Sequence, residues 1–88
     1  MIKMILLQYK IKDELGIHAR PAGNLVKKAR EFISEIIIEK ANKNADAKKL
    51  MSVMSLGIRF NDLITLKISG VDEKHAAEEM EKFLEENL

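Results

Sequence analysis

The spacing of apolar residues along this chain changes repeatedly between the period of a β-strand and that of an amphipathic helix. Four segments alternate in the strand pattern or form runs too short for a helix: 7–12, 35–40, 43–46 and 63–69. Their inward faces are expected to carry Leu7, Tyr9 and Ile11 in the first segment and Ile64, Leu66 and Ile68 in the last. Asn42, in the turn between the second and third segments, is the residue there that best tolerates a left-handed backbone.

Three further segments show helical spacing: about 19–31, about 48–56, and a C-terminal segment after Asp72. Pro21 suits position N1 of the first helix, because its missing N–H has no partner in the first turn. Gly57 is well placed to end the second helix, and Asp72 to cap the third. The expected buried stripes are Ala22, Leu25, Val26, Ala29 and Ile33 in the first helix and Ala76, Met80, Phe83 and Leu84 in the third.

The resulting order, βαββαβα, contains no repeat, linker or low-complexity tract. It predicts a single domain over residues 1–88 of the α+β class. The natural architecture is an open-faced β-sandwich, in which a four-stranded antiparallel sheet carries three helices on one face.

Composition excludes several classes of function. The chain has no cysteine, and its two histidines lie far apart, so no metal site is expected. Fifteen basic residues against fourteen acidic ones leave a charge of only +1, which argues against nucleic-acid binding. The sheet also lacks the stacking aromatics of RNA-binding sandwiches. No apolar stretch approaches the roughly 20 residues of a membrane span, and no export signal is evident, so we expect a cytoplasmic protein without membrane insertion.

His18 stands at the mouth of the first predicted helix, where the first backbone N–H groups have no acceptor. Such helix ends bind anions. Arg20 adds a planar, permanently charged donor fork suited to a phosphoryl group. The alternative is that His18 is a simple loop or cap residue and Arg20 a solvated one.

Two motifs resemble the HPr family, the histidine-containing phosphocarriers of the sugar phosphotransferase system. They are the runs Gly16–Ala22 (GIHARPA) and Leu50–Gly57 (LMSVMSLG), and the resemblance covers essentially the whole chain. It implies that Nδ1 of His18 accepts a phosphoryl group from phospho-Enzyme I and passes it to the A component of a sugar permease. It also implies a stoichiometric carrier rather than an enzyme, acting as a monomer and without a cofactor. Arg20 and the backbone N–H groups of Ala19 and Arg20 would stabilise the transferred charge.

The resemblance further implies a docking patch for partner proteins on the second helix. Its expected residues are Leu50, Met51 and Met54, ringed by the cations Lys27, Lys48 and Lys49. Helical periodicity alone leaves open that these apolar side chains belong to the core, Met54 above all. Lys27 and Arg30 are equally compatible with a solvated helix face. His75 falls off the apolar stripe of its helix, and we expect it to be exposed and inert.

The sequence departs from the family pattern in two places. Lys49 stands where many members carry a serine that a dedicated kinase phosphorylates, so this regulation is not expected. Gly23 is unusual inside a helix, where glycine costs ~1 kcal/mol relative to alanine. A regulatory binding module that docks without phosphotransfer is the alternative function, and the presence of both His18 and Arg20 argues against it.

Overall fold

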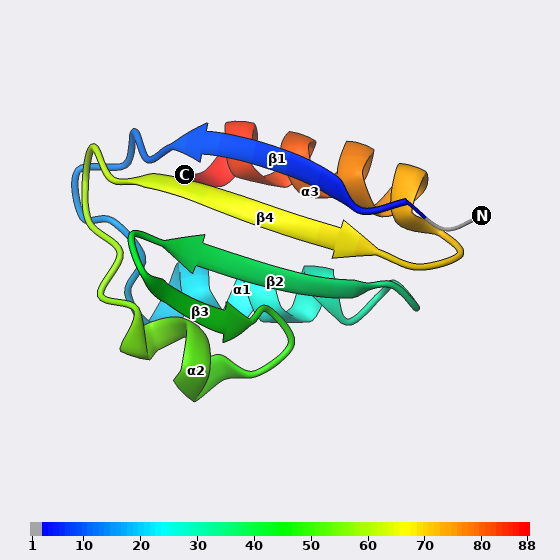
Figure 1. The fold of residues 1–88 in the computed structure, drawn as a ribbon. Helices are drawn as coiled ribbons and strands as arrows, with labels where there is room; N and C mark the ends of the chain where they lie inside the picture. The colour runs from blue at the N-terminus through cyan, green and yellow to red at the C-terminus, as the bar shows by residue number, and fades with distance from the viewer. Residues whose placement is uncertain (1–2) are drawn as a thin grey trace.

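The structure, a computed structural model, describes residues 3–88. Its elements in chain order are β1 (Ile5–Lys10), α1 (Ala19–Ala29), β2 (Glu35–Lys40), β3 (Lys43–Asp46), α2 (Leu50–Ser55), β4 (Leu63–Ser69) and α3 (Glu73–Asn87). The strands form one antiparallel sheet in the order β1-β4-β2-β3 (Figure 1). The predicted α+β open-faced β-sandwich with the order βαββαβα is confirmed.

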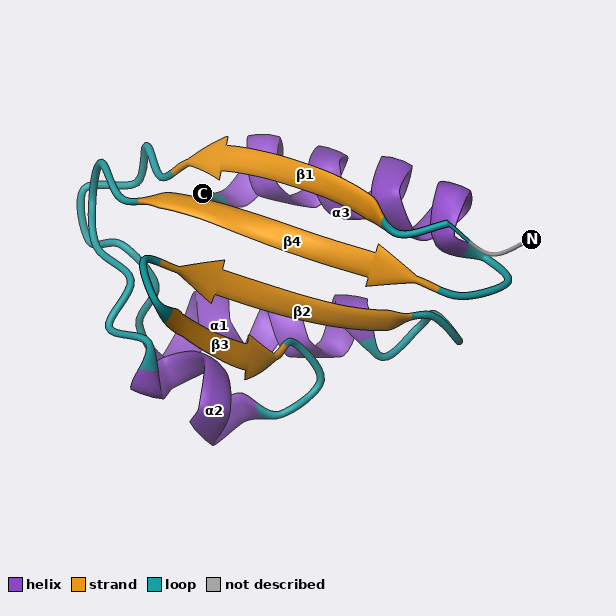
Figure 2. Ribbon diagram, in the orientation of Figure 1, coloured by secondary structure: helices purple, strands orange, loops and turns teal. Residues whose placement is uncertain are grey.

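One face of the sheet is covered by helices. Figure 2 shows α1 and α3 behind the sheet, and α2 packs against α1 and β3 at the sheet edge. The inward side chains of β4 are fully buried, as the alternation predicts: Ile64, Leu66 and Ile68. Ile36 and Ile38 of β2, for which the sequence predicted no face, are fully buried beside them. The opposing layer consists mainly of Ala22, Leu25, Ala29, Ala76, Met80 and Leu84. This shared core fixes the start of α1 relative to the sheet.

Several element boundaries differ from the prediction, beginning with β1, which starts at Ile5 rather than at residue 7. β1 ends at Lys10, and Ile11 pairs instead with a loop, donating its N–H to the Asp62 carbonyl and accepting from the Asn61 N–H, both at 2.9 Å. α1 ends at Ala29, so Ile33 is 79% exposed and does not belong to the helix stripe. Phe32 takes the buried position after the helix instead. Ile33 therefore fits the helical spacing of apolar residues by chance, beyond the end of the helix.

The turns also correct the sequence prediction. Ala41, not Asn42, has the left-handed backbone of the β2–β3 turn, with φ of 52°. A non-glycine residue there costs about 1–2 kcal/mol, which the strand pairing on both sides offsets. α2 begins at Leu50 rather than at residue 48, because the N–H groups of Lys48 and Lys49 both donate to Asp46 in a turn. Gly57 follows α2 with φ of +59°, as predicted for the end of that helix.

Asp72 lies at the N-cap position of α3, but its side chain makes no capping hydrogen bond. Its carboxylate instead reaches the loop between α1 and β2 and accepts from the N–H of Ile33, the N–H of Ser34 and the buried Ser34 hydroxyl. These bonds, with that of the Ser34 hydroxyl foremost, hold the pKa of Asp72 below its usual value. The residue is thus a tertiary clamp rather than the predicted helix cap.

We expect Asp72→Asn to destabilise the protein near neutral pH and much less in acid. A carboxyl whose folded pKa is lowered contributes stability above the pKa of the unfolded chain, about 3.9, and loses it as pH falls through the folded pKa. The difference in unfolding free energy between wild type and variant should therefore shrink below about pH 4. Urea unfolding over a pH series measures it, with the exposed Glu81→Gln as control. If the difference in unfolding free energy stayed constant down to strong acid, the ionised Asp72 carboxylate would not stabilise the fold as described.

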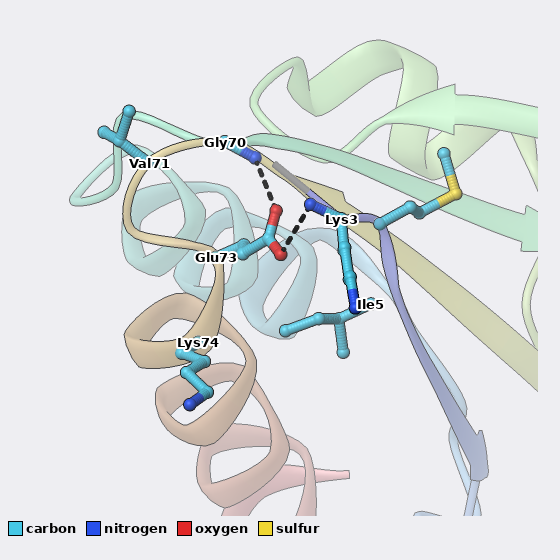
Figure 3. Close-up of a pocket in the computed structure, with 7 residues that line it drawn as sticks. Lys3, Ile5, Gly70, Val71, Glu73 and Lys74 are labelled. Atoms are coloured by element: carbon cyan, nitrogen blue, oxygen red, sulfur yellow. Dashed lines mark hydrogen bonds between the residues drawn. The ribbon is translucent and has the colours of Figure 1, made fainter. Parts of the chain in front are cut away.

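The neighbouring Glu73 joins the end of β4 to the segment before β1. Its carboxylate accepts from the Gly70 N–H and from the Lys3 N–H, each at 3.1 Å (Figure 3). The open groove beside these bonds, of about 680 Å³, lies at the end of the sheet opposite the loop that leads into α1 (Figure 1). It is therefore separate from the site around His18.

Candidate functional site

The segment before His18 lies along a second loop, residues 57–62, at the same end of the sheet (Figure 1). The Ile17 N–H donates to the Ile58 carbonyl oxygen at 3.0 Å. Gly16 has φ of +66°, and a Cβ added there would lie 2.6 Å from the Ile58 carbonyl oxygen and 2.7 Å from Arg59 Cα. Only glycine permits this backbone approach. The two loops together therefore fix how the chain enters α1.

His18 is the N-cap residue of α1, with an extended backbone (φ −113°, ψ −172°). Its carbonyl oxygen accepts from the Ala22 N–H at 2.9 Å, and its exposed side chain makes no capping hydrogen bond. The imidazole is therefore free to react with another molecule. The N–H groups of Ala19 and Arg20 have no acceptor within the helix and lie at its positive end.

Pro21 is the third residue of α1, not the first as predicted. The helix begins immediately after the extended backbone of His18, which leaves two residues before the proline. Because N–H groups throughout the first turn lack helical partners, the proline is tolerated there.

Arg20 is exposed, and its guanidinium forms no hydrogen bond or ion pair with any described residue. By contrast, Arg30 at the other end of α1 donates from Nε to the Lys48 carbonyl oxygen at 2.9 Å. Lys48 in turn donates from Nζ to the Phe32 carbonyl oxygen at 2.6 Å. Arg30 and Lys48 therefore hold the entry to α2 against the end of α1, whereas Arg20 is available to an anion.

The side chains predicted for docking on α2 are exposed: 38% for Leu50, 76% for Met51 and 37% for Met54. The core contacts of this segment come from Val53 and Leu56 instead. The alternative that the three side chains serve as core is therefore wrong, while their docking role remains a prediction.

Two of the three cations predicted for the rim of the patch, Lys27 and Lys49, are exposed, whereas Lys48 is half-buried and donates to the Phe32 carbonyl oxygen. Lys27 lies on α1, and Lys49 is the N-cap residue of α2. An open groove of about 410 Å³, lined by Gly23, Val26, Lys27, Arg30 and Leu50, separates the two helices. Gly23 thus faces open space, with nothing within 4 Å of an added Cβ.

Two exposed apolar residues near His18 were not predicted from the sequence as part of the site. Leu15 is 76% exposed and Phe60 48% exposed, and they flank the close contact between Gly16 and Arg59. They add exposed apolar surface at the two loops that lead to His18. An apolar residue between polar neighbours in a predicted loop was the available signal in both cases.

The remaining predicted features lie apart from this surface. His75 is exposed, as predicted, and its ring meets the edge of Phe32 with centroids 5.5 Å apart. Within residues 3–88 no group of three His, Asp or Glu side chains could hold a metal ion. No helix in that range is long and apolar enough to cross a membrane.

Residues 7–86 match the family described as PTS HPr component phosphorylation site. The chain belongs to the HPr family. It is 49% identical over 75 residues to the phosphocarrier protein HPr of Buchnera aphidicola subsp. Baizongia pistaciae, which covers 85% of this chain and 88% of the relative.

The fold is similar to that of two solved structures of the HPr family. The histidine-containing phosphocarrier protein of a mycoplasma superimposes with a TM-score of 0.90 at 32% identity, covering 93% of each chain. The Crh protein of Bacillus subtilis, described as a catabolite repression protein in a swapped dimer, has a TM-score of 0.75 at 32% identity, covering 91% of this chain and 92% of its own. The HPr resemblance inferred from the two sequence motifs is thereby confirmed.

Proposed function

We propose that this protein accepts a phosphoryl group on His18 from phospho-Enzyme I and passes it to the A component of a sugar permease. The observation that carries the proposal is the exposed, unengaged His18 at the positive end of α1, beside an Arg20 without a partner in residues 3–88. Both residues lie within the part of the chain that matches the HPr family.

In the transfer, the lone pair of His18 Nδ1 attacks the phosphorus of the phosphohistidine on Enzyme I. A new N–P bond forms as the donor N–P bond breaks, and the donor imidazole leaves with the electron pair and takes up a proton. The His18 ring releases the proton on Nε2 in the same exchange, so that protons and charge balance. The phosphoryl oxygens accept from the N–H groups of Ala19 and Arg20 and from the Arg20 guanidinium. The second transfer reverses these roles, so the protein is a stoichiometric carrier and not a catalyst.

Partner docking is proposed for the patch of Leu50, Met51 and Met54, with Lys27 and Lys49 at its rim. Exposed apolar side chains on α2, which packs against the helix that His18 caps, suit a transient interface. Cations at the rim favour acidic partner surfaces through an association rate that falls as salt rises. A carrier that meets two partners in turn needs this face open, and we propose that the protein acts as a monomer. We propose the cytoplasm as its location, where the proposed partners would be met.

The alternative is a regulatory module that docks without phosphotransfer, a role to which the similarity with Crh draws attention. A pure adaptor needs neither an exposed nucleophile nor an unpaired arginine beside it. Incubation with phosphoenolpyruvate and Enzyme I, followed by intact mass, distinguishes the two. We expect the gain of one phosphoryl group that is labile in acid and stable in alkali. No gain under conditions that charge Enzyme I would favour the adaptor.

Arg20→Ala should slow transfer from phospho-Enzyme I by at least about tenfold, because one donor to the transferred oxygens is lost. Since Arg20 is exposed, the unfolding free energy should change by no more than about 0.5 kcal/mol. Rapid-quench kinetics and urea unfolding measure the two effects. Arg20→Lys keeps the charge without the planar fork, so its transfer rate should lie between those of the wild type and Arg20→Ala. An unchanged rate in Arg20→Ala would show that the helix end suffices.

We also propose that the ATP-dependent serine kinase of the family does not modify this protein. The N-cap of α2 is Lys49, which has no hydroxyl, and the Ser55 hydroxyl donates to the Ser52 carbonyl oxygen. Kinase treatment followed by peptide mass mapping should find no phosphate, and Lys49→Ser should become a substrate. Stoichiometric modification of Ser52 or Ser55 would overturn this.

A further inference from the structure

The loop 57–62 supports the segment that leads to His18 through three backbone hydrogen bonds. Its Ile58 carbonyl accepts from Ile17, its Asn61 N–H donates to Ile11, and its Asp62 carbonyl accepts from Ile11. His18 follows Ile17 directly in the chain. The position of the nucleophile therefore depends on the shape of a loop about 40 residues away in sequence, which the sheet topology brings to the same end of the fold.

Lys40, the last residue of β2, joins the two ends of that loop. Its Nζ donates to the Gly57 carbonyl oxygen at 2.7 Å and pairs with Asp62 Oδ2 at 2.8 Å. The two side chains are 24% and 28% exposed, so water screens the pair only in part. Asp62 Oδ2 also accepts from the Arg59 N–H at 2.7 Å. One ammonium group thus closes the loop at its first and last residue.

The Asp62 carboxylate is ionised in this arrangement. The Lys40 ammonium foremost, and then the Arg59 N–H, lower the pKa of Asp62 from its ordinary value. The ion pair is therefore present throughout the neutral range. Within the loop it supplements the backbone bond from the Asp62 N–H to the Arg59 carbonyl oxygen at 3.0 Å.

We propose that Lys40 is a positioning residue for phosphoryl transfer, acting through the loop 57–62 and the Ile17–Ile58 hydrogen bond on the placement of His18. The proposal rests on the proposed function of His18 as the phosphoryl acceptor. The hydrogen bond and the ion pair of Lys40 both end on the loop and not on His18, so the proposed effect is on the geometry of the site. A misplacement of the order of 1 Å in a reacting group can cost up to about a hundredfold in rate.

The test compares Lys40→Met with Lys67→Met. Lys67 forms an ion pair of similar exposure with Glu39, at 3.2 Å, between two neighbouring strands of the sheet, and serves as the matched control. We expect Lys40→Met to lower the maximal rate of transfer from phospho-Enzyme I about tenfold with little change in KM. Lys40→Arg should restore most of the rate, and Lys67→Met should transfer like the wild type.

Hydrogen exchange at the Ile17 amide, compared with that at the Leu66 amide in the central strand β4, gives a second readout. A general loss of stability speeds exchange at both amides, whereas local opening of the loop speeds it at Ile17 alone. We expect faster exchange in Lys40→Met and wild-type exchange in Lys67→Met. Wild-type transfer by Lys40→Met, or equal slowing by both variants, would overturn the proposal. If the wild type itself accepts no phosphoryl group, the proposed function fails, and the exchange comparison alone then decides whether Lys40 holds the loop that places His18.

Discussion

Replacing Gly16 by alanine should lower the unfolding free energy by at least about 2 kcal/mol, which is large for a protein of this size. Two costs add at this position. The φ of +66° is unfavourable for any residue with a Cβ, and that Cβ would lie 2.6 Å from the Ile58 carbonyl oxygen and 2.7 Å from Arg59 Cα. The neighbours are backbone atoms, so a side-chain rotation cannot relieve the contact.

The same substitution should slow phosphoryl transfer, because the loop 57–62 must move away from the segment that carries His18. Gly23→Ala is the matched control: the chemical change is identical, but nothing lies within 4 Å of the added Cβ. Since an interior helix glycine costs about 1 kcal/mol relative to alanine, this control should stabilise the protein by up to that amount. Urea unfolding of both variants measures the effect on stability, for which Gly23→Ala is the control, and transfer kinetics of Gly16→Ala measures the second effect. Equal stability changes in the two would contradict the packing described for Gly16.

The fold could be predicted because its core residues are regularly spaced in the sequence. Ile64, Leu66 and Ile68 alternate on β4 and are fully buried, and the helix α1 places Ala22 and Leu25 on the opposing face. Element boundaries were less predictable. Nothing in the local sequence indicates that Ile11 pairs with a distant loop or that the helix stops before Ile33.

The local conformations that were predicted wrongly are set by contacts with other parts of the fold. Asp72 stands at the position of a helix cap in the sequence. The fold brings it within reach of Ser34, and its carboxylate accepts hydrogen bonds from the Ser34 N–H and hydroxyl instead. Ala41 is held in a left-handed backbone by the strands on either side of it, against its own preference. Such outcomes depend on which segments become neighbours, which local propensity does not specify.

In the candidate site, too, some residues could be predicted from the sequence and others could not. His18 and Arg20 could be predicted because both lie in one short run at the start of a helix. Lys40 and Asp62 could not, because they are far apart in sequence from His18 and from one another, and a single lysine at the end of a strand is an ordinary feature. Only the folded loop 57–62 connects them to the nucleophile.

His18→Ala should abolish phosphoryl acceptance completely. The imidazole makes no capping hydrogen bond and is exposed, so alanine removes the nucleophile while leaving the core unchanged. The variant should therefore remain folded. His75→Ala is the matched control, because His75 is the other histidine of the chain and is also exposed.

The decisive measurement is the intact mass of the wild type, His18→Ala and His75→Ala proteins after incubation with phosphoenolpyruvate and Enzyme I. We expect one acid-labile phosphoryl group on the wild type and on His75→Ala, and none on His18→Ala. Circular dichroism of the three proteins confirms that each is folded before the comparison is made. A folded His18→Ala protein that still gains one phosphoryl group would contradict the assignment of His18 as the acceptor.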